Sequence, residues 1–321
     1  MKAWIHTKYG PPEVLQLKEV PKPTPKDNEV LVKVKATTVN RTDCGLRSAE
    51  YFISRFFTGL LKPKYQIQGN EFAGVIESTG KAVTQFAVGD NVFGYNEKTF
   101  GAHAEYMALA ETEAIATIPA GYTFEEAAPL LEGSHYALCD IRAAKVESGQ
   151  NVLVNGATGA IGSAAVQIIK HLGARVTAVC NTKNVELVKS LGADEVIDYT
   201  QQDFTKTNQV FDFIFDAVGK SSFGACKPLL TKKGIYISTE LGKNAENVWL
   251  ALLTSLGGGK KLLFPIPTIS KNDVVFIKQL AETGKFKPVI DSTYTFEQIV
   301  SATKYVESGQ KTGNVVITIH H

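Results

Sequence analysis

The sequence has 321 residues, of which 44% are hydrophobic and 21% are charged, close to the averages of soluble globular proteins. Lysine and arginine outnumber aspartate and glutamate by only 34 to 32, so no strong field favours nucleic acid or a membrane surface as a partner. No apolar run approaches the ~20 residues of a membrane span, and no secretory signal is visible at the N-terminus. We therefore expect a cytoplasmic protein of two domains.

Short strands separated by turn-forming residues are predicted over the first third of the chain. After a helix predicted at 273–283, the last residues again show the pattern of short strands. We expect the strand at 315–319 to pair with the strands of the first third of the chain. The strands predicted in the first third cover residues 2–5, 30–34, 72–77 and 91–93.

From about residue 124 the pattern changes to alternating helices and strands. Such βαβ repetition predicts a parallel sheet with helices on both faces, so the fold class is α/β. We place the first, β-rich domain at 1–123 and 285–321 and the second at 124–284. The predicted helices are 125–146, 160–172 and 185–191, and the predicted strands are 151–154, 175–180, 195–198, 211–216 and 234–238.

A GxxGxxG turn joins the strand at 151–154 to the following helix. This spacing alone is weak evidence, but a strand before it and a helix after it are the context of a dinucleotide site. Small residues let the backbone approach a pyrophosphate, and the N–H groups at the start of the helix point at it. The candidate cofactor contacts in the turn are Gly156, Ala157, Thr158, Gly159, Ala160, Ile161 and Gly162.

The choice between NADH and NADPH depends on residues about 20 positions further on, where NAD enzymes place a carboxylate against the ribose. The stretch 180–183 holds no carboxylate. Asn181 and Thr182 can donate hydrogen bonds there, and Lys183 can pair with a phosphate. The alternative is that Lys183 only begins a solvated helix. We therefore predict NADP(H) as the cofactor.

Several stretches resemble the medium-chain dehydrogenase/reductase superfamily, in its zinc-free, zeta-crystallin-like NADPH:quinone oxidoreductase branch. They are KYGPPEVLQLKEVPKP, NRTDCGLRS, GNEFAGVIESTGKAVTQFAVGDNVFG, EEAAPLLEG, GATGAIGSAAVQIIKHLGA and LVKSLGADEVIDY. The resemblance covers essentially the whole chain. It implies a GroES-like catalytic domain beside a Rossmann domain, with the nicotinamide and the substrate between them, and a homodimer joined through an edge strand at 261–265.

Zinc-dependent members of this superfamily carry a cysteine ligand where this chain has Asn40 and a histidine where it has Asn70. Neutral amides are poor zinc ligands, and a third ligand would fall near Glu132. One carboxylate cannot hold a catalytic zinc, so no metal site is expected.

Without a metal, the resemblance implies hydride transfer to an acceptor that is already electrophilic, a quinone or an α,β-unsaturated carbonyl. Tyr51 lies where relatives place a tyrosine that donates to the carbonyl oxygen, although it could equally be a packing aromatic. Asn40 and Asp43 resemble the polar pair on the substrate side, although they could equally form a turn at the end of a strand. Glu132 and His135 begin the helix expected at the cleft.

Four further cofactor contacts are carried over from the resemblance. Tyr199 resembles the tyrosine near the adenosine phosphate of NADPH-selective relatives. Val218 and Leu241 follow the fourth and fifth strands of the Rossmann sheet, whose carboxyl edge faces the dinucleotide. Asn314 stands where relatives commonly carry a basic residue, which leaves its role open.

Two rival interpretations are a short-chain dehydrogenase and a non-catalytic NADPH-binding protein. A short-chain dehydrogenase needs Tyr-x-x-x-Lys, and none of the eleven tyrosines has a lysine four residues on. A non-catalytic NADPH-binding protein with a structural or redox-sensing role would have the same fold, and nothing in the sequence excludes it.

Overall fold

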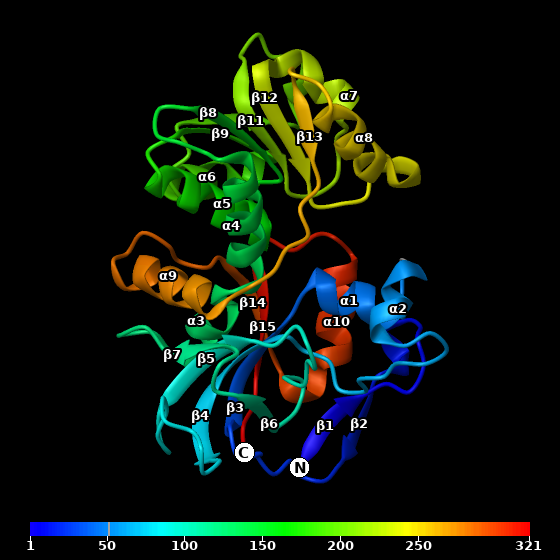
Figure 1. Cartoon of the computed structure of the whole chain (residues 1–321), viewed down its shortest axis with the longest axis vertical. Coiled ribbons are helices and arrows are strands. Elements are labelled where there is room, and N and C mark those ends of the chain that lie inside the picture. Colours follow the sequence, from blue (N-terminus) through cyan, green and yellow to red (C-terminus); the bar gives the residue numbers. More distant parts are fainter. Residues whose placement is uncertain (51) are drawn as a thin grey trace. The chain divides into compact units, whose positions relative to one another are not determined.

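The computed structural model describes residues 1–50 and 52–321 (Figure 1). The position of Tyr51, the predicted carbonyl donor, lies outside the described residues. Contacts between Cα atoms divide the chain into two compact units. The first consists of Met1–Glu132, Ile269–Thr283 and Pro288–His321, and the second of Gly133–Thr268 and Gly284–Lys287.

The second unit is built on a six-stranded sheet with the order β10-β9-β8-β11-β12-β13, and every neighbouring pair is parallel. This confirms the predicted parallel, Rossmann-like sheet. Its strands read as apolar runs because helices shield a parallel sheet on both faces. The strands are β8 (Asn151–Asn155), β9 (Arg175–Cys180), β10 (Glu195–Asp198), β11 (Phe211–Asp216), β12 (Leu230–Ser238) and β13 (Lys261–Leu263).

The helices of the second unit connect these strands. The helix after β8 buries most of its side chains, and its last turn carries Lys170 and His171, which suit the negative end of the helix dipole. Residue 132, the first of α4, belongs to the first unit. The helices are α4 (Glu132–Ala144), α5 (Ala160–His171), α6 (Val185–Ser190), α7 (Phe223–Cys226) and α8 (Glu246–Ser255).

The first unit contains a seven-stranded sheet with the order β14-β15-β3-β4-β5-β7, in which β6 also pairs with β3. The tail strand β15 pairs antiparallel with β3, which confirms that the end of the chain returns to the first module. A separate hairpin joins β1 and β2. The strands are β1 (Lys2–Ile5), β2 (Gln16–Glu19), β3 (Glu29–Val39), β4 (Glu71–Thr79), β5 (Asn91–Tyr95), β6 (Tyr106–Ala110), β7 (Ala114–Thr117), β14 (Ile290–Thr295) and β15 (Asn314–Thr318).

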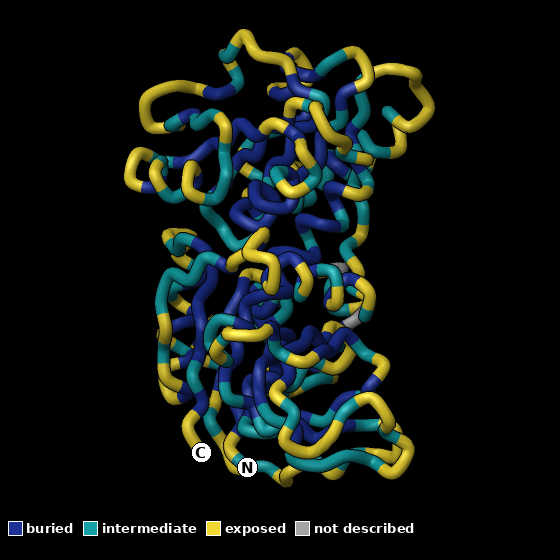
Figure 2. The backbone as a smooth tube through the Cα atoms, turned by 90° about the vertical axis from the view of Figure 1, so that its left-hand side faces the viewer, coloured by how far each residue is buried: buried dark blue, intermediate teal, exposed yellow. Residues whose placement is uncertain are grey.

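Helices also belong to the first unit, which is therefore not the all-β module predicted for it. The helix α10 packs on the sheet, where its Ile299, Ala302 and Val306 join the apolar core. In each unit the buried backbone lies in the interior and many exposed stretches lie at the surface (Figure 2); β3 and β8 are mostly buried, whereas β2 and β14 are mostly intermediate or exposed. The helices are α1 (Arg41–Ser48), α2 (Arg55–Thr58), α3 (Phe124–Ala127), α9 (Lys271–Glu282) and α10 (Ile299–Glu307).

Two other predictions differ from the structure. The helix predicted at 125–146 is interrupted, because Pro129 leaves helical geometry at φ −84° and ψ 18° between α3 and α4. The division into units also differs from the predicted boundaries, since residues 124–132 and helix α9 belong to the first unit. A hydrogen bond of 2.6 Å from Lys278 Nζ to Thr117 Oγ1 ties α9 to β7 of that unit. Among the described residues, no helix is long and apolar enough to cross a bilayer.

Candidate functional site

The glycine turn between β8 and α5 needs glycine at two of its three positions. Gly156 has φ +76°, and a Cβ there would lie 2.3 Å from Val218 Cγ1. A Cβ on Gly162 would lie 2.1 Å from the carbonyl oxygen of Gly156. Gly159 has φ −69°, a Cβ there would meet no atom closer than 3.8 Å, and the residue is the N-cap of α5. The turn therefore folds tightly against the first turn of α5, whose N–H groups lack intrahelical acceptors and suit a pyrophosphate.

The loop after β11 lies against this turn. The Asp216 carboxylate is fully buried and accepts hydrogen bonds from Asn155 Nδ2 at 2.9 Å and Ser221 N at 2.8 Å. The Tyr236 hydroxyl donates to the same carboxylate at 3.2 Å. These bonds hold the loop that carries Val218 close to Gly156, so two of the predicted cofactor contacts lie together. Sequence reasoning did not assign Asp216 this anchoring role.

The ends of β9 and β10 bring Thr182 and Tyr199 into one region. Parallel pairing sets Asp198 opposite Cys180, and the Tyr199 N–H donates to the Cys180 carbonyl at 2.9 Å. The Tyr199 side chain is 56% exposed, and Lys183 is exposed as well. The side-chain oxygen of Asn181 is buried without a hydrogen-bond partner in the described structure. These groups form a polar edge that carries one cationic side chain, Lys183.

A carboxylate that sequence reasoning missed lies in the same region. Asp198 accepts a 2.6 Å hydrogen bond from the Thr182 hydroxyl, which lowers the pKa of Asp198. The N–H and hydroxyl of Thr200 and the side-chain amide of Gln201 also donate to it. The stretch 180–183 itself lacks a carboxylate, but the neighbouring strand supplies one. Only the register of β9 with β10 could have indicated this.

In the first unit, Asn40 and Asp43 form the capping box that begins α1. The Asp43 N–H donates to Asn40 Oδ1 at 2.9 Å, and the Asn40 N–H donates to Asp43 Oδ2 at 3.2 Å. Both residues are buried. The segment therefore starts a helix rather than a simple turn, and the box fixes the orientation of the Asn40 side chain.

Asn40, Asn70 and Glu132, the three positions of zinc ligands in zinc-dependent relatives, lie together in the first unit. Asn40 Nδ2 donates to Asn70 Oδ1 at 2.7 Å, and Asn70 Nδ2 lies 3.4 Å from Glu132 Oε2. Two hydroxyls complete the cluster: Thr42 donates to Glu132 Oε1 at 2.6 Å, and Tyr95 accepts from Asn70 Nδ2 at 3.1 Å. Neither hydroxyl was predicted. Thr42 stands between two predicted residues, whereas Tyr95 joins through the pairing of β4 with β5.

A second buried carboxyl group, Glu71, supports this cluster. Glu71 Oε1 accepts from the N–H groups of Leu131 at 3.0 Å and Glu132 at 2.6 Å, and Glu71 Oε2 accepts from the Thr38 hydroxyl at 2.6 Å. Burial raises the pKa of Glu71 to about 8 and that of Glu132 to about 7. Burial likewise raises the pKa of Asp43 to about 7. The cluster is thus built from groups that are neutral, or partly so, near neutral pH.

The donor atoms of this cluster do not fit a catalytic zinc. The two amides are hydrogen-bonded to each other, and among residues 1–50 and 52–321 the carboxylate of Glu132 is the one hydrogen-bonded to a side-chain amide of this pair. Over residues 1–50 and 52–321, no group of three or more His, Cys, Asp or Glu side chains is placed to hold a metal ion.

The remaining predicted residues are dispersed. Asn314 begins β15 in the first unit, and its amide donates to the Val289 carbonyl at 3.0 Å. Leu241 follows β12 in the second unit, where its carbonyl accepts from the Asn247 N–H at 3.0 Å. His135 is buried on α4 of the second unit.

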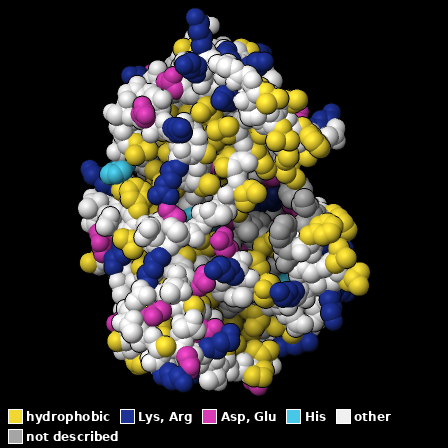
Figure 3. All heavy atoms as spheres, in the orientation of Figure 1, with side chains coloured by type: hydrophobic (Ala, Val, Ile, Leu, Met, Phe, Trp, Pro, Cys, Tyr) yellow, Lys and Arg dark blue, Asp and Glu magenta, His cyan; other side chains and the backbone are white. Residues whose placement is uncertain are grey.

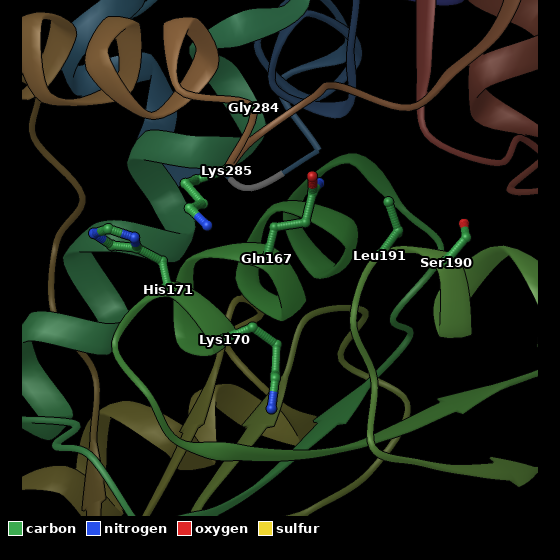
Figure 4. A pocket seen from close by; sticks show the side chains of 7 residues that line it. All are labelled: Gln167, Lys170, His171, Ser190, Leu191, Gly284 and Lys285. Carbon is green, nitrogen blue, oxygen red and sulfur yellow. The ribbon is translucent and has the colours of Figure 1, made fainter.

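A cavity of about 310 Å³ lies in the second unit, apart from the glycine turn (Figure 4). It is at the last turns of α5 and α6, whereas the glycine turn is at the first turn of α5. Lys170 is bound to both carboxylate oxygens of Asp194, at 2.9 and 2.8 Å. The cavity is therefore not part of the predicted dinucleotide site. It is lined by Gln167, Lys170, His171, Ser190, Leu191, Gly284 and Lys285.

Two protein families match the chain. Residues 26–120 match the alcohol dehydrogenase GroES-like domain, and residues 191–317 match the zinc-binding dehydrogenase family. A 2-methylene-furan-3-one reductase from Solanum lycopersicum is 33% identical over 99% of this chain and 79% of its own. An NADPH-dependent alkenal/one oxidoreductase from Arabidopsis thaliana is 30% identical over the same shares of the two chains.

A solved structure has the same fold. The quinone oxidoreductase from Coxiella burnetii superposes with a TM-score of 0.89 and 24% identity, over 100% of this chain and 99% of that one. The identity with the two plant enzymes establishes the family, and the GroES-like match covers strands β3 to β7 of the first unit. The chain belongs to the medium-chain dehydrogenase/reductase superfamily, in its quinone oxidoreductase branch.

Proposed function

We propose that the protein reduces a quinone or an α,β-unsaturated carbonyl compound with NADPH. Relatives named as an alkenal/one oxidoreductase, a furanone reductase and a chloroplast envelope quinone oxidoreductase homolog support this reaction class. The observation that carries the proposal is the hydrogen bond between Asn40 and Asn70, which occupies the place of two metal ligands in zinc-dependent relatives. A site of this kind suits an acceptor that needs no Lewis acid.

NADPH, when bound, supplies a hydride to the β-carbon of the enone or to the quinone ring. The turn from Gly156 to Gly162 and the first turn of α5 would bind the pyrophosphate. Lys183 would pair with the ribose phosphate, and Tyr199 would border it. We infer that Leu241 and Val218 border the cofactor and that Asn314 orders the backbone near Val289.

On the acceptor, the hydride forms a new C–H bond, and the electron pair of the former double bond moves to the oxygen. The oxygen then needs a hydrogen-bond donor and the product needs one proton. We assign the donor role to Tyr51 and the shaping of the acceptor pocket to Asn40 and Asp43. Asp43 holds Asn40 through the capping box, so the two act as one unit.

We also propose that the reaction is independent of zinc. The amide pair and its single carboxylate neighbour are a poor donor set for that ion. Metal analysis of the purified protein, and turnover after dialysis against a chelator, test this. Less than stoichiometric zinc with unchanged turnover is expected, and loss of activity that zinc restores would disprove it.

A cytoplasmic homodimer completes the proposal. β13 is the last strand of the parallel sheet, and one of its edges has no strand beside it among the described residues. Antiparallel pairing of this edge with a second copy would satisfy its backbone groups. Sedimentation equilibrium tests the dimer independently of activity.

The decisive experiment measures NADPH oxidation with a panel of quinones and enones, with NADH as the matched cofactor. We expect turnover with at least one acceptor class and a preference for NADPH. Tight NADPH binding without turnover of any acceptor would instead favour the non-catalytic role. Replacement of Tyr51 by Phe should lower kcat for enones, and an unchanged kcat would remove Tyr51 from the mechanism.

A further inference from the structure

A carboxylate lies at the edge of the parallel sheet where the ribose phosphate of NADPH is expected. It belongs to Asp198, the last residue of β10, which pairs with Cys180 at the end of β9. The carboxylate accepts hydrogen bonds from the Thr182 hydroxyl at 2.6 Å, the Thr200 hydroxyl at 2.7 Å, the Thr200 N–H at 2.9 Å and the Gln201 side-chain amide at 3.0 Å. We refer to Asp198, Thr182 and Thr200 as the hydroxyl–carboxylate cluster.

The protons of the two threonine hydroxyls are used within this cluster. Each hydroxyl has one proton to donate, and an ionised carboxylate only accepts. Thr182 and Thr200 each donate to Asp198, and the two hydroxyl oxygens also lie 2.9 Å apart. Hydrogen bonding from Thr182 lowers the pKa of Asp198, which is therefore ionised at neutral pH. Neither hydroxyl then has a proton for a phosphate oxygen, although the sequence predicted Thr182 as such a donor.

Lys183 is the cation nearest in sequence to this cluster. It directly follows Thr182 and is exposed, and it forms no ion pair within the part of the chain that the structure describes. A phosphate bound at this edge would thus be attracted by Lys183 and repelled by Asp198. Basic and acidic side chains are interspersed over the face drawn in Figure 3, and the formal net charge is +2, so no wider field of one sign overrides these two charges.

We propose that Asp198 is a specificity-determining residue that limits the preference of the protein for NADPH over NADH; this rests on the NADPH-dependent reaction proposed above. Its charge repels the ribose phosphate, and its hydrogen bonds withhold two hydroxyl protons from the phosphate oxygens. Neither effect acts on NADH, which has a ribose hydroxyl in place of the phosphate. In NAD enzymes a carboxylate accepts a hydrogen bond from that hydroxyl. Asp198 therefore narrows the difference in affinity between the two cofactors.

The rival interpretation is that Asp198 only fixes the turn after β10. The same local arrangement occurs at Asp203, whose carboxylate accepts from the Thr205 N–H at 2.9 Å and the Thr205 hydroxyl at 2.7 Å. Such a turn is a common local motif. Asp198 differs because it also accepts from Thr182, which lies just beyond the end of β9. The turn does not need this contact, which sets the carboxylate beside the residue before Lys183.

The test measures the Kd of NADPH and the Kd of NADH by titration calorimetry, without an acceptor. Asp198→Asn keeps the size of the side chain and removes its charge, so the ratio of the NADH Kd to the NADPH Kd should rise about threefold or more. Asp203→Asn removes the same charge from the matched turn and should leave the ratio unchanged. Asp198→Ser removes the charge with a shorter side chain and should also raise the ratio, so the test does not depend on the folding of one variant.

Thr182→Val separates the two effects of Asp198. Alone it should leave the ratio nearly unchanged, because the hydroxyl that it removes donates to Asp198. Combined with Asp198→Asn it should remove part of the gain, because the Thr182 hydroxyl of Asp198→Asn is able to donate to the phosphate.

Two outcomes would overturn the proposal. An unchanged or lower ratio in both Asp198 variants would show that the carboxylate serves only the turn. Binding of NADPH weakened on the order of tenfold by Thr182→Val alone would show that this hydroxyl donates directly to the phosphate. Because the titrations involve no acceptor, a failure here leaves the proposed reaction untouched, and a lack of turnover in the acceptor panel leaves the expected change of the ratio in force.

Discussion

Asp43, Glu71 and Glu132 place three buried carboxyl groups in one region of the first unit. Each has a pKa raised by burial, to about 7, 8 and 7. A carboxyl whose folded pKa is raised binds more protons in the native than in the unfolded state, between its ordinary pKa, 3.8 for Asp43 and 4.5 for the two glutamates, and the raised value. The free energy of unfolding therefore falls as the pH rises through this window.

The variant Glu71→Gln should reduce the decrease in the free energy of unfolding with rising pH. A glutamine oxygen can still accept from the Leu131 and Glu132 N–H groups, but it carries no charge that must be buried at high pH. We expect urea unfolding to give a flatter profile between about pH 5 and pH 8.5, with the variant gaining on the order of a few kcal/mol relative to wild type at the upper end. Glu19→Gln, an exposed carboxyl, is the control. Parallel profiles of wild type and Glu71→Gln would contradict the assignment.

Lys183 tests the choice of cofactor at the level of one charge. It is exposed beside Thr182, whose hydroxyl is engaged with the Asp198 carboxylate. Without the lysine, that carboxylate would face the ribose phosphate uncompensated. Lys183→Ala should weaken NADPH binding on the order of tenfold and leave NADH nearly unchanged, as measured by titration calorimetry. Lys189→Ala, which breaks the ion pair with Glu186 on α6, is the matched control. Equal losses for both cofactors would count against a phosphate contact.

At the scale of elements, the glycine turn gives a matched pair of substitutions. Gly162→Ala would place a Cβ 2.1 Å from the Gly156 carbonyl oxygen, so β8 and α5 would have to separate. Gly159→Ala finds its nearest atom at 3.8 Å, at an ordinary φ of −69°. We expect Gly162→Ala to lower the free energy of unfolding by about 2 kcal/mol or more and to weaken NADPH binding. Gly159→Ala should keep the free energy of unfolding within about 1 kcal/mol of wild type in the same denaturation assay. A similar loss in both variants would show that the close packing at Gly162 does not determine the stability of this turn.

The sequence predicted the elements of the parallel sheet better than those of the first unit. The strands of the parallel sheet are apolar runs between helices of clear periodicity, so β9, β10 and β11 begin and end where predicted. Helix α1 was not predicted, because its start depends on a capping box that also reads as a turn. The apolar spacing of residues 125–146 predicted one continuous helix, which the non-helical geometry of Pro129 interrupts. Helix α8, apolar on both faces, gave no helical period.

The candidate site likewise has a part that the sequence predicts and a part that it does not. The glycine turn is contiguous in sequence and is predictable from its spacing, whereas the polar cluster joins Asn40, Asn70, Tyr95 and Glu132 from four segments. The resemblance indicated three of these positions, since relatives bind zinc there. Tyr95 and Asp198 enter through strand register, which no local pattern contains.

At the scale of the whole molecule, the chain passes four times between the two units, because the first unit is made of three segments. If the second unit unfolded alone, the first unit would have to hold the ends of a flexible loop from 133 to 268 together. Closing a long flexible loop costs conformational entropy. A folded second unit removes that cost, so ligand binding to the second unit should also stabilise the first.

The two tryptophans make this coupling measurable, since Trp4 is buried in the first unit and Trp249 is exposed in the second. NADPH at about 100 times its Kd contributes about 2.7 kcal/mol to the second unit, a shift of roughly 5 °C. In Trp249→Phe, the unfolding midpoint reported by Trp4 should rise by a similar amount, although the glycine turn is not in its unit. In Trp4→Phe, NADPH should raise the unfolding midpoint reported by Trp249 by the same amount. If only the Trp249 midpoint moves, the units unfold independently and the loop-closure argument fails, because chain connectivity would then carry no measurable stability from one unit to the other.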